Sequence, residues 1–206
     1  MGNKTPIKKK IVIIKKLQND VLDNKAIVKN KVGKKLEQQT DISSIKTSNN
    51  SSSSNSIIYN AQEIYPGLWL GDINSALDKK FLHSKKITCI FNCTRSLPFI
   101  EDPFVTAKYR VAVMDNLENE EIQKMYKLLN PTINKLFTML NDNNVLVHCH
   151  KGKQRSATVI IAYLMKFANM TKNEALYTVK TKRPLICTPT TNFDVALDKY
   201  EHDLQK

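Results

Sequence analysis

Residues 145–156 read VLVHCHKGKQRS and decide how the rest of the chain is interpreted. The apolar run Val145 to Val147 predicts a short buried strand, and the nearly all-apolar stretch from Ser156 to Met170 predicts a buried helix. The basic segment between them is therefore a tight strand-to-helix loop with one glycine. Such a loop directs backbone N–H groups and the positive end of a helix dipole at one spot, which predicts an anion-binding site.

Cys149 lies at the base of this predicted site, where the donors that bind a phosphate also stabilise a thiolate. Arg155 follows six residues later, at a distance from which its guanidinium group can hold two oxygens of the anion. Ser156 is expected to donate its hydroxyl to the sulfur, and the alternative is a serine that bonds only to backbone at the helix N-terminus. The residues expected to bind the phosphate are His150, Lys151, Gly152, Lys153, Gln154 and Arg155.

Two further features of the loop remain open at this point. His148 stands at the strand end and is expected to hydrogen-bond surrounding structure rather than to act as a base, because no second histidine is placed as in a Cys-His protease. The charges of His150, Lys151 and Lys153 are either solvated or add positive potential at the mouth of the site, which would favour multiply anionic substrates.

The chain from about residue 57 onward alternates strand and helix signals, which predicts one α/β domain over residues 57–206. The 206-residue length allows one core of ordinary size and a tail. The expected strands are 68–70, 87–93, 109–114 and 145–147, and the expected helices are 73–81, 120–140 and 156–170, followed by one opened by a capping box at Thr171 and Glu174 and a last one opened by Thr191 and Asp194.

Residues 1–56 are predicted to be a disordered basic tail that ends in the Ser/Asn-rich linker SSIKTSNNSSSSNS. The tail holds 12 lysines and 4 acidic residues, whereas the whole chain has a net charge of +13. Because most of the positive charge lies in the tail, no nucleic-acid partner is expected for the folded part. A solvated arm is favoured over a membrane contact through the lysine-flanked run Ile11 to Ile14. No run of residues is long and apolar enough to predict a membrane span.

Four cysteines, at positions 89, 93, 149 and 187, are expected to be free thiols in a reducing compartment, either the cytoplasm or also the nucleus. Cys89 and Cys93 lack a second pair of ligands nearby, so no metal site is expected. Whether Cys93 or Cys187 forms a disulfide with an oxidised Cys149 is left open.

The pattern HCxxGxxR[ST], present at His148, Cys149, Gly152, Arg155 and Ser156, resembles the signature of the protein tyrosine phosphatase superfamily. The surrounding segments IYPGLWLGDINSA, ITCIFNCT, VMDN, MTKNEAL and TKRPLICTPTTNF resemble the dual-specificity phosphatases. This resemblance implies a central mixed, mostly parallel sheet flanked by helices. It also implies hydrolysis of phosphotyrosine and phosphoserine or phosphothreonine through a phosphocysteine intermediate, with no cofactor and with a phosphoprotein, such as a phosphorylated kinase, as substrate.

The same resemblance gives Asp115, which follows the predicted strand 109–114, the role of general acid and then general base. The alternative from the residues alone is an Asp-Asn pair that forms a turn. Two positions depart from the family pattern: the loop carries Lys151 and Lys153, and the usual asparagine after the second proline of the last segment is Thr190. The basic loop resembles those of phosphoinositide and inositol-pyrophosphate phosphatases, so an inositol phosphate substrate is the alternative. A non-catalytic phosphate-binding module is the third hypothesis.

Overall fold

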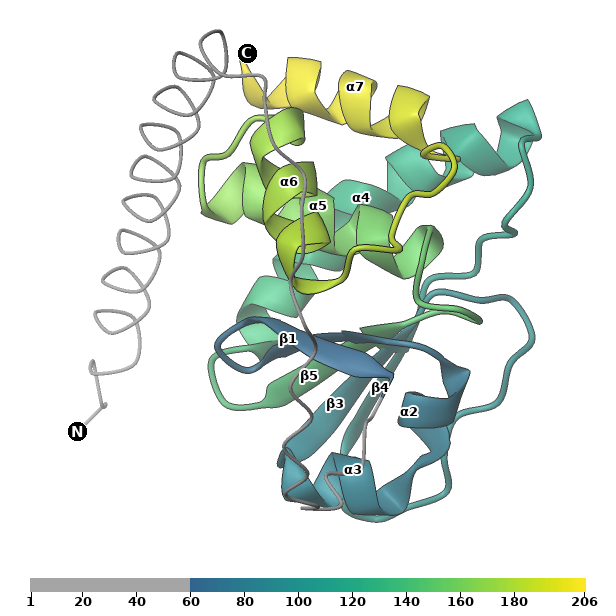
Figure 1. Cartoon of the computed structure of the whole chain (residues 1–206), viewed down its shortest axis with the longest axis vertical. Helices are drawn as coiled ribbons and strands as arrows, with labels where there is room; N and C mark the ends of the chain where they lie inside the picture. Colours follow the sequence, from purple (N-terminus) through teal and green to yellow (C-terminus); the bar gives the residue numbers. More distant parts are fainter. Residues whose placement is uncertain (1–59) are drawn as a thin grey trace, which may run out of the picture.

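The computed structural model describes residues 60–206, which form a five-stranded sheet in the order β1-β2-β5-β3-β4 (Figure 1). The strands β2, β5, β3 and β4 run parallel, and β1 pairs antiparallel with β2 at one edge. The predicted mixed, mostly parallel sheet is thus confirmed. The predicted tail lies outside the described residues. The strands are β1 (Ala61–Tyr65), β2 (Leu68–Gly71), β3 (Ile87–Asn92), β4 (Ala107–Arg110) and β5 (Asn144–His148).

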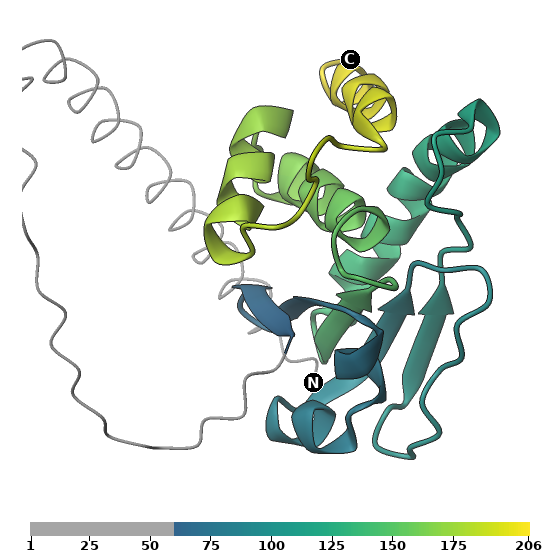
Figure 2. The same cartoon turned by 45° about the vertical axis from the view of Figure 1, so that its right-hand side comes forward.

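Helices cover both faces of this sheet, as the two views in Figures 1 and 2 show. The short helices α2 and α3 lie on one face, and the four longer helices lie on the other. The helices are α2 (Ile73–Leu77), α3 (Lys79–Ser84), α4 (Asn119–Met139), α5 (Arg155–Phe167), α6 (Lys172–Lys182) and α7 (Asp194–Leu204). None of them is long and apolar enough to cross a bilayer.

The strand β5 occupies the centre of the sheet, between β2 and β3, and is buried on both faces. Val145 and Val147 face the large core formed with α4 to α7, and Leu146 faces the smaller core formed with α2 and α3. An all-apolar strand is what a parallel sheet covered on both sides requires. The chain that leaves β5 is therefore held firmly at its point of departure.

Two predicted elements differ from the structure. The helix expected over residues 73–81 is broken in two at Asp78, whose carboxylate accepts the Phe81 N–H at 3.0 Å and so caps α3. The strand expected over 109–114 is β4 instead, and it ends at Arg110, because Val113 N–H turns back to the Val111 carbonyl at 2.9 Å. Residues 111–114 thereby leave the sheet and carry Asp115 outward.

The helices predicted from the sequence agree with the structure better than the predicted edge strands do. The strand β1 had no predicted counterpart. The capping box of α6 is confirmed, since the Glu174 N–H donates to Thr171 Oγ1 at 3.3 Å and the Thr171 N–H to Glu174 Oε2 at 2.9 Å. The cap predicted for α7 is wrong, because Asp194 N–H bonds to the backbone carbonyl of Thr191 and no side chain caps this helix.

Leu146 tests how strongly the domain depends on β5. Its side chain is fully buried, so Leu146→Ala is expected to lower the free energy of unfolding by about 2–5 kcal/mol through lost burial and a residual cavity. Chemical denaturation measures this value. Leu204→Ala, at a residue 38% exposed near the end of α7, is the control and is expected to change it by less than about 0.5 kcal/mol. Equal effects of the two variants would contradict the central role of β5.

Candidate active site

The loop between β5 and α5 places Cys149 at the inner end of a short basic turn. The Cys149 side chain is almost completely buried, and Ser156, in the first turn of α5, is fully buried beside it. Ser156 Oγ donates a hydrogen bond to Cys149 Sγ at 3.2 Å. Of the two alternatives for Ser156, the structure therefore favours contact with the sulfur.

The carbonyl groups of residues 148–154 are all engaged, because each accepts a hydrogen bond. In the described part of the chain, no protein group accepts from the backbone N–H groups of residues 150–155. These N–H groups are the donors that an anion can use. The carbonyl partners are Cys93 N for His148, His148 Nδ1 for Cys149, Ile73 N for His150, Arg183 Nη2 for Lys151, Arg183 Nε for Gly152, Cys187 N for Lys153, and Thr158 N for Gln154.

Gly152 permits the tightest point of the turn. Its φ angle is +63°, in the left-handed region, and a Cβ atom there would lie 2.5 Å from the carbonyl oxygen of Gly71. Any other residue would therefore combine backbone strain with a clash against β2. The loop can approach the sheet this closely only because position 152 is a glycine.

Arg183, which follows α6, supports the loop from beneath. Its guanidinium group donates to the carbonyls of Gly152 at 2.8 Å and Lys151 at 3.1 Å, and to Asn60 and Gln62 on the other side. The residue is only 7% exposed. Burial lowers the pKa of Arg183, while the nearby Asp72 carboxylate and Cys149 sulfur raise it. A buried guanidinium group thus lies within electrostatic reach of the Cys149 sulfur.

Arg155 reaches across the site toward the segment that carries Asp115. Its Nη1 donates to the Val113 carbonyl at 3.2 Å, and its Nε lies 3.6 Å from Asp115 Oδ2. The Nε atom is buried and has no hydrogen-bond partner among the described residues. Since a buried unpaired donor is costly, its orientation indicates a site for an anion that binds from outside the chain.

Asp115 is brought to this site although it lies on a distant segment. Asn192 Nδ2 donates to Asp115 Oδ1 at 2.9 Å. The preceding backbone is fixed as well, because the Met114 N–H donates to Glu121 Oε2 at 2.8 Å. The Asp115 carboxylate is 29% exposed and faces Arg155, so the predicted acid and the predicted anion-binding arginine lie within reach of one reacting group.

The remaining loop residues divide into two kinds. His150 and Lys151 are exposed and Lys153 is partly exposed, so the lysine charges lie at the rim of the site. Gln154 is buried, and its side chain points away from the anion site: Nε2 donates to the Thr190 carbonyl at 2.7 Å and Oε1 accepts the Asn192 N–H at 3.1 Å. The amide side chain of Gln154 therefore binds the C-terminal segment, and its backbone N–H remains available to a phosphate.

His148 is buried under the loop, where its Nδ1 lies 3.3 Å from the Cys149 carbonyl. Burial lowers the pKa of His148 to about 4, so the imidazole is neutral at physiological pH. Burial raises the pKa of the Cys187 thiol to about 11 and of the Cys89 thiol to about 12, and it raises the pKa of the Cys93 thiol well above its ordinary value. These three cysteines are therefore held as neutral thiols.

Arg183, Glu121 and Asn192 were not predicted from the sequence as parts of the site. Arg183 stood within the segment TKRPLICTPTTNF, where an arginine next to a proline looks like a solvated charge after a helix. Glu120 and Glu121 are adjacent in the first turn of α4, and Glu121 is the one that is buried. The sequence alone does not distinguish the two. Asn192 lies two residues after Thr190, the position at which the family usually has an asparagine. Gln154 binds the backbone carbonyl of Thr190 and not its side chain.

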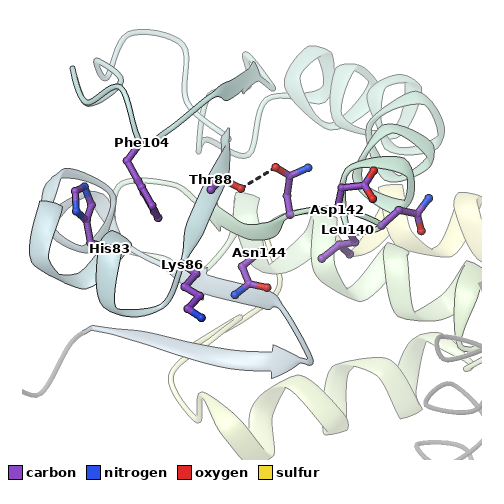
Figure 3. A pocket seen from close by; sticks show the side chains of 9 residues that line it. His83, Lys86, Thr88, Phe104, Leu140, Asp142 and Asn144 are labelled. Atoms are coloured by element: carbon purple, nitrogen blue, oxygen red, sulfur yellow. Dashed lines mark hydrogen bonds between the residues drawn. The ribbon is translucent and has the colours of Figure 1, made fainter. Parts of the chain in front are cut away.

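A second hollow, of about 690 Å³, lies at the opposite end of β5 (Figure 3). The dashed line in Figure 3 is the 2.7 Å hydrogen bond from Thr88 Oγ1 to Asn143 Oδ1 on its wall. β5 begins at this hollow and ends at the loop that carries Cys149, so the two are about a strand length apart, roughly 16 Å. Within residues 60–206, no group of His, Cys, Asp or Glu side chains could hold a metal ion. The hollow is lined by His83, Lys86, Thr88, Phe104, Leu140, Asn141, Asp142, Asn143 and Asn144.

Comparison with known proteins gives concordant matches. Residues 68–203 match the family described as dual specificity phosphatase, catalytic domain. "Dual specificity protein phosphatase 1" of Arabidopsis thaliana is 35% identical over 143 residues, which cover 69% of this chain and 69% of that protein. "Dual specificity protein phosphatase 8" of Homo sapiens is 33% identical over 143 residues, but these cover only 22% of that protein.

Solved structures agree with the sequence matches. A mouse dual specificity phosphatase complexed with zinc tungstate superposes with a TM-score of 0.66 and 29% identity, covering 76% of this chain and 95% of that chain. Human DUSP28 superposes with a TM-score of 0.64 and 29% identity, covering 73% and 98%. A structure of PTPMT1 in complex with PI(5)P, at 16% identity and a TM-score of 0.53, shows the same fold.

The neutral state of His148 gives a pH-dependent stability. In the unfolded chain a histidine binds a proton near pH 6.5, whereas in the fold His148 does so only near pH 4. Between these values the unfolded state holds more protons, so the contribution of His148 is present above pH 6.5 and is lost as the pH falls toward 4. We expect about 2–3 kcal/mol of the acid-induced loss of unfolding free energy to come from this residue.

The measurement is urea denaturation at pH 7 and at pH 4.5. His148→Gln should lose less unfolding free energy between the two pH values than the parent does. His202→Gln, at an exposed histidine near the end of α7, should behave like the parent. The same pH dependence in His148→Gln and in the parent would contradict the buried neutral imidazole.

Proposed function

The chain belongs to the dual-specificity phosphatases, cysteine-based enzymes of the protein tyrosine phosphatase superfamily, and we propose that it hydrolyses phosphate monoesters of tyrosine and of serine or threonine in proteins. The observation that supports this most directly is that Asp115, from a distant segment, lies beside the loop that carries Cys149 and Arg155. Cys149 follows β5, Arg155 opens α5 with a buried unpaired Nε, and Asp115 lies 3.6 Å from that Nε. A binding module would require the first two groups but not the acid.

In the first step of the proposed mechanism, Cys149 Sγ attacks phosphorus, so that a P–S bond forms while the P–O bond to the substrate breaks. The backbone N–H groups of residues 150–155 and the Arg155 guanidinium bind the phosphoryl oxygens, on which negative charge must be stabilised. Asp115 transfers its proton to the departing oxygen of the side chain. The dephosphorylated protein then leaves, and phosphocysteine remains.

In the second step, a water molecule attacks phosphocysteine, and the Asp115 carboxylate takes a proton from it. The P–S bond breaks, and inorganic phosphate is released. Ser156 Oγ, which donates to Cys149 Sγ at 3.2 Å, stabilises the sulfur as it departs with the electron pair. No cofactor or metal has a part in this proposal.

A phosphorylated protein, such as a kinase phosphorylated on a loop, is the proposed substrate, in the cytoplasm or also in the nucleus. The charges of Lys151, which is exposed, and of Lys153, which is partly exposed, lie at the rim of the site and attract an anionic segment. The same charges also suit an inositol phosphate. A comparison of rates on phosphopeptides and on soluble inositol phosphates decides between the two substrates.

The nucleophile assignment predicts that Cys149→Ser loses activity on 4-nitrophenyl phosphate by at least about 10³-fold, because a serine hydroxyl is not ionised in this loop. Steady-state release of 4-nitrophenol measures the loss. Cys89→Ala is the matched control, since Cys89 is also buried but lies in β3, outside the loop. It should retain the parent rate within about threefold. A Cys149→Ser variant as fast as the parent would exclude the mechanism.

The substrate class predicts that kcat/KM for phosphotyrosine and phosphothreonine peptides exceeds that for soluble inositol phosphates by at least about tenfold, a difference of about 1.4 kcal/mol in transition-state binding. The measurement is phosphate release from a panel of these compounds by the full chain. Cys149→Ser serves as the blank for each substrate. Faster release from inositol phosphates than from phosphopeptides would replace the protein substrate by the alternative.

A further inference from the structure

Asn192 makes a direct side-chain contact with the carboxylate of Asp115. Its Nδ2 lies 2.9 Å from Asp115 Oδ1. The segment around it is anchored on both sides, because Gln154 in the catalytic loop holds the Asn192 N–H and the Thr190 carbonyl, and Phe193 is fully buried. The backbone of Asn192 is therefore fixed to the loop that carries Cys149, and its side-chain amide extends from this fixed position to Asp115.

The two oxygens of Asp115 have different surroundings. Oδ1 accepts the hydrogen bond from Asn192, and Oδ2 faces Arg155 Nε at 3.6 Å. A carboxylic acid carries one proton, and its carbonyl oxygen is a better acceptor than its hydroxyl oxygen, so an amide N–H bound to Oδ1 favours the proton on Oδ2. When Asp115 is protonated, the proton therefore lies on Oδ2, on the side of the guanidinium that holds the phosphate.

The other contacts of this segment do not replace that of Asn192. Glu121 binds the backbone N–H of Met114, and the torsion that turns a carboxylate is broad and weakly restrained by itself. Arg155 Nε lies 3.6 Å from Asp115 Oδ2, beyond hydrogen-bond distance, and in the proposed mechanism its guanidinium group binds the phosphoryl oxygens instead. Among the described residues, Asn192 is thus the contact that can hold the carboxylate throughout the reaction.

We propose that Asn192 is the positioning residue of the general acid: its amide fixes the rotation of the Asp115 carboxylate and assigns the transferable proton to Oδ2. This inference rests on the proposed phosphatase function and on Asp115 as its acid. In the first step Oδ2 then delivers its proton to the departing oxygen, and in the second step the same atom receives a proton from water. Gln154 couples this arrangement to the catalytic loop through the Asn192 backbone.

A double-mutant cycle with two leaving groups tests the proposal. The variants are Asn192→Ala, Asp115→Ala and the double variant. The substrates are phenyl phosphate, whose leaving group has a pKa of about 10, as tyrosine does, and 4-nitrophenyl phosphate, whose leaving group departs readily without a proton. The matched control is Asn130→Ala, which removes an exposed amide in α4 that accepts a hydrogen bond from Lys166 in α5. A further variant at the same position is Asn192→Asp, which is isosteric but has a charged carboxylate in place of the amide donor.

We expect Asn192→Ala to lower kcat/KM on phenyl phosphate by about tenfold and on 4-nitrophenyl phosphate by less than about twofold, because kcat/KM reports the first step, in which only the poor leaving group depends on the proton. Asn192→Asp should show the same pattern with a larger loss. In the Asp115→Ala background the further change Asn192→Ala should have less than about a twofold effect, since the group that it positions is absent. Asn130→Ala should equal the parent.

Equal losses on the two substrates, an undiminished loss in the Asp115→Ala background, or no loss at all would each overturn the proposal. These outcomes are distinct from failure of the proposed function. If Asp115→Ala hydrolyses phenyl phosphate as fast as the parent, the acid itself is wrongly assigned, and the inference about Asn192 is overturned together with it.

Discussion

The site depends on one constraint: every backbone carbonyl from His148 to Gln154 must be bound by a group outside the backbone of residues 149–155, as each of them is. Only then do the N–H groups of residues 150–155 remain available to an anion, since no protein group among the described residues accepts from them. A peptide unit that is turned outward leaves its N–H facing inward, and the reverse holds as well. The seven carbonyl partners are therefore as much a part of the anion site as the N–H groups themselves.

These partners come from nearly every part of the domain. Cys93 extends from the end of β3, Ile73 opens α2, Thr158 belongs to α5, and Arg183 and Cys187 belong to the segment after α6. The fold can thus be understood as a frame that supplies hydrogen-bond donors to one loop. Arg183 contributes most, because one planar guanidinium group satisfies two successive carbonyls and also brings a positive charge near the sulfur.

Sequence could predict the part of the site that is local in the chain. The strand, the loop and the helix from residue 145 to 170 follow one another, so their pattern of apolar, basic and glycine residues is sufficient to place Cys149, Gly152 and Arg155 together. Asp115 required the family resemblance, because alternation extended the strand beyond Arg110 and did not indicate the turn at Val113. Arg183, Glu121 and Asn192 act through single contacts across the fold, and no periodic pattern marks such contacts.

The burial of β5 on both faces has a consequence for how the protein loses its activity on heating. The strand leads directly into the loop that carries Cys149, and Leu146, Val145 and Val147 belong to the two cores that hold the domain together. A segment of this kind opens only when the surrounding core opens. Loss of activity on heating should therefore coincide with global unfolding. The residual activity would then equal the fraction of molecules that remain folded, with no separate local unfolding of the site.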